Sequence, residues 1–518
     1  MGYALIDVTQ QFQFEVLKQL VEKSNCDIKF VTTTNKGHFR GDEQRCLSLL
    51  DEIKKTNNSV VHEGLDFLNG DSFISKINSI PWVLTSNHII ELKEIESLCM
   101  RLMDRVSLKS ISAFSRRRYY LILLNYFSYI IEKEKITDVI VFDIPHTFYS
   151  YVFYQLCKKK KLNTIVLEHH YLTGYSAIHN QFSFPEIPKD YLPEISLPKL
   201  EEKIPTDINE VLFKSSPFLV ASKIKETKAI VKSGKFSTLK LIIRYFDKAT
   251  KNFIMGCFPF FFKKEVLHFT ALDNIKNRFI YRNLLNIKLI KLIRLNIQYN
   301  KICEKNPNLN CNYVFLALHM QPEKTSQPMG LEFDNQFMMV KVISQSMPKG
   351  WKLFVKEHPN QFNVRKVPNR HYRDSIFYKA LSQIENVKFI PLEKDSRQLV
   401  IKSKMIATLT GTVGWEAITA FKPALVFGES YYMNCGSVRK VTSVNSCKKA
   451  IDELLSLSKE DMKSEIYRYL SYYLDNKFLV KAGRWETELI SNELSYNEQV
   501  DNIADRMFYF HKLNNINN

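Results

Sequence analysis

The chain contains little glycine and lacks the motifs of several common enzyme classes. Only 15 of its 518 residues are glycine, and neither a Walker motif nor a Gly-x-Gly-x-x-Gly fingerprint occurs. Kinase, ATPase and dehydrogenase functions therefore have no support. An Asp-x-Asp motif is also missing, which argues against transferases that hold a nucleotide diphosphate through a cation. We expect a protein that requires neither a metal nor a cofactor.

Cysteine usage and hydrophobic runs indicate the compartment. The nine cysteines are scattered and form no Cys-x-x-Cys pair, as is typical of reduced thiols in the cytoplasm. The first residues do not read as a secretory signal. The longest apolar run, at 253–262, has ten residues, whereas crossing a bilayer takes about 20. We expect a cytoplasmic protein that can also rest on the inner face of the cytoplasmic membrane.

The chain is strongly basic, with a formal net charge of +19. Such a charge favours an acidic partner, which would be nucleic acid, an anionic membrane surface, or an anionic sugar or nucleotide. A merely solvated basic surface explains the charge equally well. No dedicated nucleic-acid motif occurs, and we therefore expect no nucleic-acid partner.

The first part of the chain alternates strand-like and helix-like segments. This rhythm predicts parallel strands joined by right-handed helical crossovers. Strands are predicted at 4–8, 27–32, 82–85, 138–142 and 163–167, and helices at 11–23, 115–133 and 148–160.

A second rhythm of the same kind begins at residue 313 and describes a complete doubly wound unit. At 518 residues the chain is too long for one core, so two Rossmann-like domains are the expectation. Strands are predicted at 313–318, 352–355, 387–390, 405–409 and 424–427, helices at 335–346, 373–384, 396–402 and 412–421, and a helical tail at 448–518.

Between the two rhythms, residues 212–300 are basic and aromatic. Two interpretations are open for this predicted helical connector. Its apolar face packs on the two domains, or it is an interfacial helix that rests on an anionic membrane.

Two strand ends of the second half carry residues that suit a nucleotide. Lys356 and His358 follow the strand at 352–355, where Pro359 ends the strand and restricts the histidine backbone. Both side chains can donate hydrogen bonds to phosphate, and His358 as a cation would stabilise a departing nucleotide phosphate. A plain His-Pro turn is the alternative.

The second strand end reads Thr410, Gly411, Thr412, Val413, Gly414, and it leads into a predicted helix that carries Glu416. Glycine lets a backbone approach a ligand, and a helix N-terminus favours an anion. Phosphate contact is favoured over a plain capped helix, because a glutamate on the first turn suits the hydroxyls of a ribose or sugar.

Other polar and aromatic residues could line the same site. His319, Gln321 and Glu323 follow the strand at 313–318, and they either face the ligand or form a polar loop between domains. Tyr431 either stacks on a base or packs in the core.

In the first half, Asp143 and Glu168 lie just beyond two predicted strands. Carboxylates in such a place can deprotonate an acceptor hydroxyl or act as nucleophiles. His169 and His170 are adjacent, but a third metal ligand at a useful spacing is missing, so no metal site is predicted.

Three segments of the second half stand out together: LALHMQPEKTSQPMG, GWKLFVKEHPNQF and TLTGTVGWEAITAFKPALVFGESYY. They resemble the capsular-polysaccharide biosynthesis family of bacterial glycosyltransferases, which includes transferases that take 3-deoxy-manno-octulosonic acid (Kdo) from its CMP-activated form. The resemblance covers about residues 312–441. The first half matches the family only in its order of strands and helices.

The resemblance implies a GT-B architecture, in which two Rossmann-like domains face a cleft. We accordingly divide the chain into an acceptor domain at 1–210, a basic helical connector at 211–310, a nucleotide-donor domain at 311–445 and bracing helices at 446–518. The resemblance also implies that His358 and the turn at 410–414 hold the nucleotide phosphate, that Glu416 lies near ribose or sugar, and that the catalytic carboxylate comes from the first half.

These implications favour a glycosyltransferase that moves a sugar, Kdo or another acidic sugar, from a nucleotide-activated donor, with CMP as the expected nucleotide. The acceptor would be a growing capsule or lipopolysaccharide glycan or glycolipid. Two enzymes of the same architecture remain open, a CDP-polyol phosphotransferase and a nucleotide-sugar 2-epimerase. A non-catalytic partner in polysaccharide assembly or export is the alternative outside the enzymes.

Overall fold

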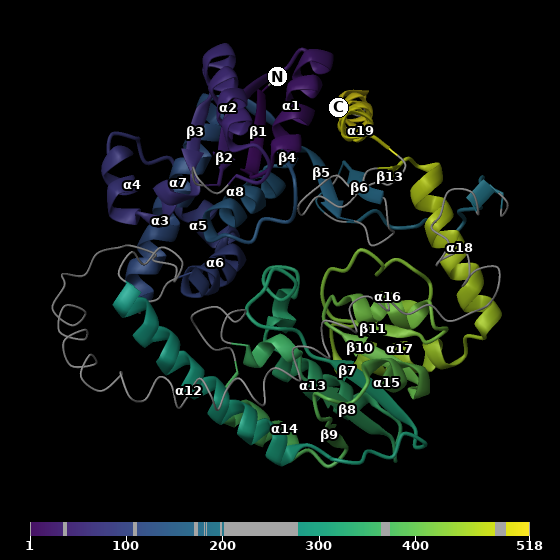
Figure 1. Ribbon diagram of the computed structural model, residues 1–518. Helices are drawn as coiled ribbons and strands as arrows, with labels where there is room; N and C mark the ends of the chain where they lie inside the picture. Colours follow the sequence, from purple (N-terminus) through teal and green to yellow (C-terminus); the bar gives the residue numbers. More distant parts are fainter. Residues whose placement is uncertain are drawn as a thin grey trace. The chain divides into compact units, whose positions relative to one another are not determined.

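A computed structural model shows two compact α/β units, each built on its own sheet (Figure 1). Unit 1 takes its described residues from 1–205 and 470–518, and unit 2 from 270–469. Most of the predicted connector, including the apolar run at 253–262, lies outside the described residues. The structure describes residues 2–34, 39–106, 111–169, 175–180, 182, 184–196, 199–200, 278–363, 373–481 and 494–516.

Unit 1 is built on seven strands: β1 (Gly2–Val8), β2 (Asp27–Thr33), β3 (Val60–Glu63), β4 (Ile136–Val141), β5 (Asn163–His169), β6 (Tyr175–His179) and β13 (Leu479–Lys481). Their order across the sheet is β13-β6-β5-β4-β1-β2-β3. Strands β1 to β5 are parallel, whereas β6 and β13 add to one edge in antiparallel fashion. The strand order reverses between β1 and β4, which is where parallel sheets of this kind bind ligands.

Helices cover both faces of this sheet, because its strands are apolar on both sides. Along β1, Ala4 and Ile6 face one hydrophobic cluster, while Tyr3 and Leu5 face the other. The helices of unit 1 are α1 (Gln11–Ser24), α2 (Glu43–Asn57), α3 (Gly64–Leu68), α4 (Gly70–Lys76), α5 (Ser86–Glu91), α6 (Lys93–Val106), α7 (Ala113–Lys133), α8 (Phe148–Lys159) and α19 (Tyr496–Ile516).

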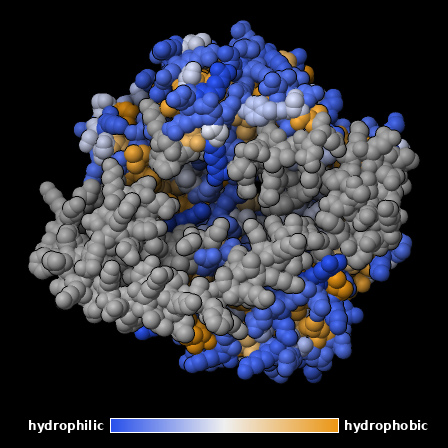
Figure 2. Space-filling model, in the orientation of Figure 1, coloured by the Kyte–Doolittle hydropathy of each residue, from blue (hydrophilic) through white to orange (hydrophobic). Residues whose placement is uncertain are grey.

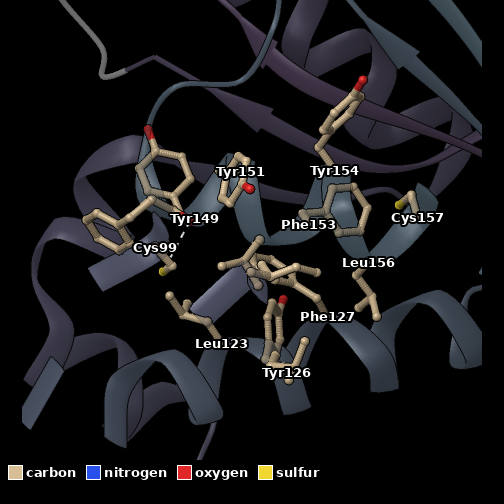
Figure 3. Packing of buried hydrophobic residues seen from close by; sticks show 14 of the residues in the cluster. Cys99, Leu123, Tyr126, Phe127, Tyr149, Tyr151, Phe153, Tyr154, Leu156 and Cys157 are labelled. Atoms are coloured by element: carbon tan, nitrogen blue, oxygen red, sulfur yellow. Dashed lines mark hydrogen bonds between the residues drawn. The ribbon is translucent and has the colours of Figure 1, made fainter. Parts of the chain in front are cut away.

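The cluster beneath α6, α7 and α8 is unusually aromatic (Figure 3). Phe127 of α7 and Phe153 of α8 pack with their ring centroids 5.1 Å apart. The ring of Tyr149 stacks on Phe67 of α3 at 4.5 Å. Aromatic pairs of this kind add about 0.5–1.5 kcal/mol each beyond their buried area, so this face fixes how α8 sits on the sheet.

The C-terminal segment returns to unit 1. Helix α18 (Lys459–Asp475) leads to β13, which pairs with β6. Helix α19 then packs along α1, and its residues Ile503, Met507 and Phe510 join the second hydrophobic cluster. This part of the tail therefore belongs to unit 1, and the predicted bracing of both domains remains a prediction.

Unit 2 is built on six parallel strands: β7 (Tyr313–Ala317), β8 (Lys352–Lys356), β9 (Val387–Phe389), β10 (Met405–Thr408), β11 (Ala424–Val426) and β12 (Val438–Lys440). Their order is β12-β11-β10-β7-β8-β9, and it reverses between β7 and β10. Its helices are α12 (Arg278–Ile302), α13 (Gln336–Ser346), α14 (Ser375–Ser382), α15 (Ser396–Lys402), α16 (Thr412–Ile418), α17 (Val444–Leu455) and the two short 3₁₀ helices η2 (Leu331–Asp334) and η3 (Pro359–Phe362).

The predicted fold class is confirmed, because both sheets are doubly wound and parallel at their centres. Nearly all predicted strands and helices occur within a few residues of their predicted bounds. The predicted cleft between the domains and the predicted domain boundaries remain predictions. Four short strands, β3, β6, β12 and β13, were not predicted, and β13 interrupts the tail at 448–518 that was predicted to be helical.

The strand predicted at 82–85 is wrong. Thr85 is instead the N-cap of α5 and accepts a hydrogen bond from the backbone N–H of His88. The side chain of Asn125 on α7 accepts from the N–H of Val83 and donates to the carbonyl of Pro81. A side chain therefore satisfies backbone groups that a neighbouring strand would otherwise bond.

Hydrophilic side chains dominate the described surface in the view of Figure 2, with hydrophobic ones in small separate patches. Among the helices that the structure describes, none is both long and apolar enough to cross a membrane.

Candidate functional site

The reversal of strand order in unit 2 places two predicted site segments side by side. Strands β7 and β10 pair directly, and each ends at the same edge of the sheet. His319 follows β7, and the turn from Thr410 to Gly414 follows β10. Ligands of doubly wound sheets bind at this edge, at the point of reversal.

His319 connects the two segments through both of its ring nitrogens. The backbone N–H of Thr410 donates to Nε2 at 3.2 Å, and the Thr408 hydroxyl lies 3.0 Å from the same atom. Since Nε2 accepts, the neutral ring carries its proton on Nδ1, which lies 3.3 Å from the hydroxyl of Thr325. That hydroxyl in turn donates to the carboxylate of Glu323.

The charge of His319 follows from its surroundings. Burial, together with the nearby His358 and Arg373, lowers its pKa to about 3. His319 is therefore neutral at pH 7. It serves here as a fixed acceptor that shapes the turn after β10, and its predicted contact with a ligand remains a prediction.

The glycines of this turn are explained by contacts within the protein. A Cβ on Gly414 would lie 2.1 Å from the hydroxyl oxygen of Tyr432, and one on Gly411 would lie 2.8 Å from Oγ1 of Thr408. The Tyr432 hydroxyl also donates to the Gly411 carbonyl. The two glycines are thus required by close contacts with Thr408 and Tyr432.

The rest of the turn and the start of α16 are partly exposed. Gly411 is the N-cap of α16, and no side chain caps this helix. The hydroxyl of Thr412 donates to the carboxylate of Glu416 at 3.5 Å. Both side chains are half-buried. Glu416 therefore lies beside the turn, and its predicted contact with ribose or sugar hydroxyls remains a prediction.

Tyr431 lies in the core and is only 5% exposed. Its ring packs against Trp415 of α16 and against Tyr432, with centroid distances of 5.9 and 4.9 Å. Of the two interpretations from the sequence, packing describes its position in this structure.

Lys356 ends β8 and is only 5% exposed. Its Nζ donates to the carbonyl of Lys394 and, at 2.7 Å, to the hydroxyl of Ser396. Burial lowers the pKa of Lys356 to about 8, against the opposing effect of Asp395 and Glu393. Two of its three N–H donors thus bond to Lys394 and to the first residue of α15, and its predicted phosphate contact remains a prediction.

His358 is the N-cap of η3, and its Nδ1 accepts a hydrogen bond of 3.1 Å from the N–H of Asn360. A neutral ring with Nδ1 as acceptor carries its proton on Nε2. The imidazolium form would lose this cap, because both ring nitrogens would then be donors. The structure therefore favours His358 as a neutral Nε2–H donor over the cation considered from the sequence.

A buried ion pair supports this edge of the sheet. Arg373 Nε lies 2.5 Å from the carboxylate of Glu357, and the two side chains are 1% and 0% exposed. The hydroxyl of Tyr378 donates to the same carboxylate at 3.0 Å, and the N–H of His358 donates to its other oxygen at 2.9 Å. Because the Glu357 carboxylate accepts from the backbone N–H of His358, the ion pair fixes the position of the His358 backbone.

Arg373 reaches the other strand end as well. Its guanidinium donates to the side chain of Gln321 and, at 3.3 Å, to the carbonyl of His319. Gln321 is also held by Gln361, whose side chain accepts from its N–H at 2.8 Å. One arginine therefore ties the segments after β7 and β8 together. Gln321 forms part of this scaffold.

Sequence reasoning missed Arg373 and Glu357. Arg373 lies just before α14 and does not follow a strand, so a search for polar residues at strand ends does not find it. The one available signal was Glu357 itself, a charged residue two positions beyond the apolar run 353–355 and next to the His358-Pro359 pair. Such a residue needs a buried partner.

In unit 1, the predicted residue Asp143 follows β4. Glu168, the other predicted residue, lies near the end of the neighbouring strand β5. Val141 pairs with Val166, so these two carboxylates lie in equivalent positions two residues further on. Glu168 is only 6% exposed, and it pairs with Ala177 of β6. Asp7 lies near the end of β1, the strand that neighbours β4 on the side away from β5.

Comparison with known families confirms the resemblance for part of the chain. Residues 277–457 match a family of capsule polysaccharide biosynthesis proteins. This segment contains all the predicted site residues of unit 2. A search of curated proteins finds none that matches the chain.

The chain is similar to several solved structures at low sequence identity. The UDP-GlcNAc 2-epimerase of Methanocaldococcus jannaschii is 14% identical and covers 91% of this chain and 100% of its own, with a TM-score of 0.23. The β-Kdo 2,7-transferase of Thermosulfurimonas dismutans KpsC is 10% identical, with coverages of 73% and 87% and a TM-score of 0.28. The β-Kdo 2,4-transferase of the same protein is 11% identical, with coverages of 64% and 80% and a TM-score of 0.26.

Proposed function

We propose that this protein is a glycosyltransferase that moves a sugar from a nucleotide-activated donor to a growing capsule or lipopolysaccharide glycan. The observation that carries the proposal is the family match over residues 277–457, within which His319, His358 and the turn at 410–414 lie at one edge of a doubly wound sheet. Nucleotides bind at this edge in such sheets.

Each group at this edge has a role in the proposal. The Nε2–H of His358 donates to a phosphate oxygen of the donor and stabilises the charge that develops as the phosphate departs. The backbone of the turn at 410–414 lies against the same phosphate, in a shape that His319 and Tyr432 fix. Glu416 accepts from a hydroxyl of the ribose or the sugar.

We further propose that the donor is CMP-linked and carries Kdo or another acidic sugar. The formal net charge of +19 supports an anionic donor and an anionic glycan, because a basic protein attracts both. Since no Asp-x-Asp motif occurs, the donor phosphate is proposed to be held by protein groups without a required metal. The protein should therefore keep its full transferase activity when EDTA removes divalent metal ions.

A thermal-shift measurement tests the donor site. One nucleotide among CMP, CDP, UDP and GDP, expected to be CMP, should raise the unfolding temperature of the protein. At a hundred times its Kd, a ligand stabilises the folded state by about 2.7 kcal/mol, which for a unit of this size is roughly 5–10 °C. A lack of response to all four nucleotides would refute the donor site.

Product analysis separates transfer from the alternative activities. Mass spectrometry of a reaction with activated sugar and glycan acceptor should show the acceptor gaining one sugar. A 2-epimerase would convert the nucleotide sugar without any acceptor, and a phosphotransferase would add a phosphate together with the polyol. Either of these results would replace the proposal.

Helix α12 supports a further part of the proposal, peripheral contact with an anionic membrane. Leu292, Leu295 and Tyr299 are buried on one side of the helix. The other side exposes Ile290 and Ile297, which are 43% and 51% exposed. Exposed basic residues surround these two, and α12 contains no acidic residue. Exposed apolar side chains among cations are typical of helices that lie on anionic bilayers.

Vesicle flotation tests the membrane contact. The protein should float with vesicles that contain phosphatidylglycerol, and much less with vesicles of phosphatidylcholine alone or at high salt, since each cation near the surface contributes about 1 kcal/mol. Lys291→Glu/Arg294→Glu should abolish flotation. The control Lys448→Glu/Lys449→Glu on the exposed side of α17 changes the net charge equally and should still float. Equal loss from both variants would show that net charge alone is responsible.

A further inference from the structure

The turn after β10 directs two of its N–H groups into unit 2. The Thr410 N–H donates to Nε2 of His319 at 3.2 Å, and the Gly411 N–H donates to the Thr408 hydroxyl at 3.2 Å. The Thr408 hydroxyl itself lies 3.0 Å from the same Nε2. The side chains of His319 and Thr408 are buried. The position of the turn therefore depends on the ring of His319.

The other nitrogen of this ring leads to a carboxylate. Nδ1 of His319 lies 3.3 Å from the Thr325 hydroxyl, which in turn donates to Glu323 at 3.2 Å. The Thr410 hydroxyl donates to the carbonyl of Thr325 at 2.8 Å, so this segment lies directly against the turn. Both Glu323 and Thr325 are half-buried. A chain of hydrogen bonds thus joins a carboxylate at the edge of the sheet to the turn.

The number of protons available fixes the direction of the first bonds. A carboxylate can only accept, and a threonine hydroxyl has a single proton to donate. The proton of Thr325 goes to Glu323, so the oxygen of Thr325 can only accept from the ring. Nδ1 of His319 must therefore carry the proton, which leaves Nε2 as an acceptor.

The same direction continues to the turn. Because Nε2 accepts, the Thr408 hydroxyl donates to it, and the oxygen of Thr408 is left to accept from the Gly411 N–H. Every bond from Gly411 to Glu323 thus donates towards the carboxylate. Hydrogen bonds that are aligned in this way polarise and strengthen one another. The carboxylate is the terminal acceptor on which the whole chain ends.

We infer that Glu323 is a positioning residue of the donor site, which acts through Thr325 and His319 to hold the turn at 410–414 in place. This inference rests on the proposed function, in which the turn meets the donor phosphate. By its charge alone a carboxylate beside that phosphate would weaken binding, because like charges repel. The hydrogen-bond chain supplies a reason for its presence, and it gives charge and position opposite effects on affinity.

Two substitutions of Glu323 separate these effects. Glu323→Ala removes the terminal acceptor and should raise the Kd for CMP about tenfold, the lower end of what a hydrogen bond to a charged group contributes. Glu323→Gln keeps an acceptor for Thr325 but removes the charge, and it should bind CMP at least as tightly as the wild type. Calorimetric titration measures both. Tighter binding by both variants, or equally weak binding by both, would overturn the inference.

Controls come from the same segment of unit 2. Glu332 is exposed on η2, and Glu332→Ala makes the same change in net charge without touching the chain, so its Kd should stay at the wild-type value. Thr325→Val removes the linking hydroxyl and should weaken binding about as much as Glu323→Ala. Thr325→Ser restores the hydroxyl and should restore the affinity. Equal affinities of the valine and serine variants would contradict the inference.

A final experiment needs no ligand. Nitrogen-15 spectra of the histidine-labelled protein, assigned with His319→Gln, should show a neutral ring with its proton on Nδ1 at pH 7. Hydrogen exchange at Thr410 and Gly411 should be about tenfold faster in Glu323→Ala. If these results appear but none of CMP, CDP, UDP and GDP binds, the proposed donor site fails while the positioning chain stands. If a nucleotide binds and Glu323→Ala changes neither exchange nor affinity, the inference alone fails.

Discussion

Arg373→Ala should lower the free energy of unfolding of unit 2 by about 3–5 kcal/mol, because it leaves the carboxylate of Glu357 buried without its cation. The side chain of Glu357 is fully buried, and Arg373 also donates to Gln321 and to the carbonyl of His319. Removing the arginine therefore also loosens the segments after β7 and β8. Hydrogen exchange of peptides from β7 and β8 measures the loss within unit 2 alone.

Another Arg–Glu pair in the same unit provides a matched control. Arg439 and Glu453 lie 2.7 Å apart, but their side chains are 35% and 39% exposed. Arg439→Ala should cost at most about 1 kcal/mol, since exposed pairs contribute little. Equal losses from the two substitutions would contradict the role assigned to burial. Glu357→Gln in the Arg373→Ala background should recover part of the stability, because it removes the stranded charge.

His358→Ala should reduce kcat by about 100-fold or more while the protein stays folded. The expected cause is the loss of the Nε2–H that stabilises the departing phosphate, an interaction of the kind that typically contributes this much. The alanine also removes the cap of η3, which costs about 1 kcal/mol. Initial rates at saturating donor, together with unfolding curves, separate the two effects.

His358→Asn sharpens this test. An asparagine side chain can still accept from the N–H of Asn360 and so retains the cap, but it places no donor where Nε2 lies. The asparagine variant should therefore be as stable as the wild type and as inactive as the alanine variant. If it retains the wild-type kcat, His358 serves the turn and takes no part in the reaction.

The sequence predicts the fold well because its strands are strongly apolar and its helices strongly periodic. The segment 138–142 illustrates this, since it becomes β4 at the centre of the first sheet. The strands that were missed are short and lie towards the sheet edges. Such segments form strands only because a neighbouring strand pairs with them, which the local sequence does not show. The segment 82–85 fails for a related reason, because the Asn125 side chain takes the place of a strand partner.

Only those site residues that lie next to a predicted strand could be found from the sequence. His358 and the turn at 410–414 follow apolar strands directly, and the sheet brings the turn next to His319. Arg373 could not be predicted as their common support, because its partners lie 16 to 54 residues away in the chain. The raised pKa of Asp7 could not be predicted either, because it comes first from burial and then from the charge of Asp143, which is remote in sequence.

The return of α19 to unit 1 has a consequence for biosynthesis. Unit 1 needs β13 and α19 to complete its sheet and to cover one apolar face, yet all of unit 2 is translated in between. At about 5–20 residues per second, the ribosome spends roughly 15–50 s on that interval. During this time the nascent first half exposes the surface that α19 later covers. This surface is therefore covered only after α19 has been synthesised.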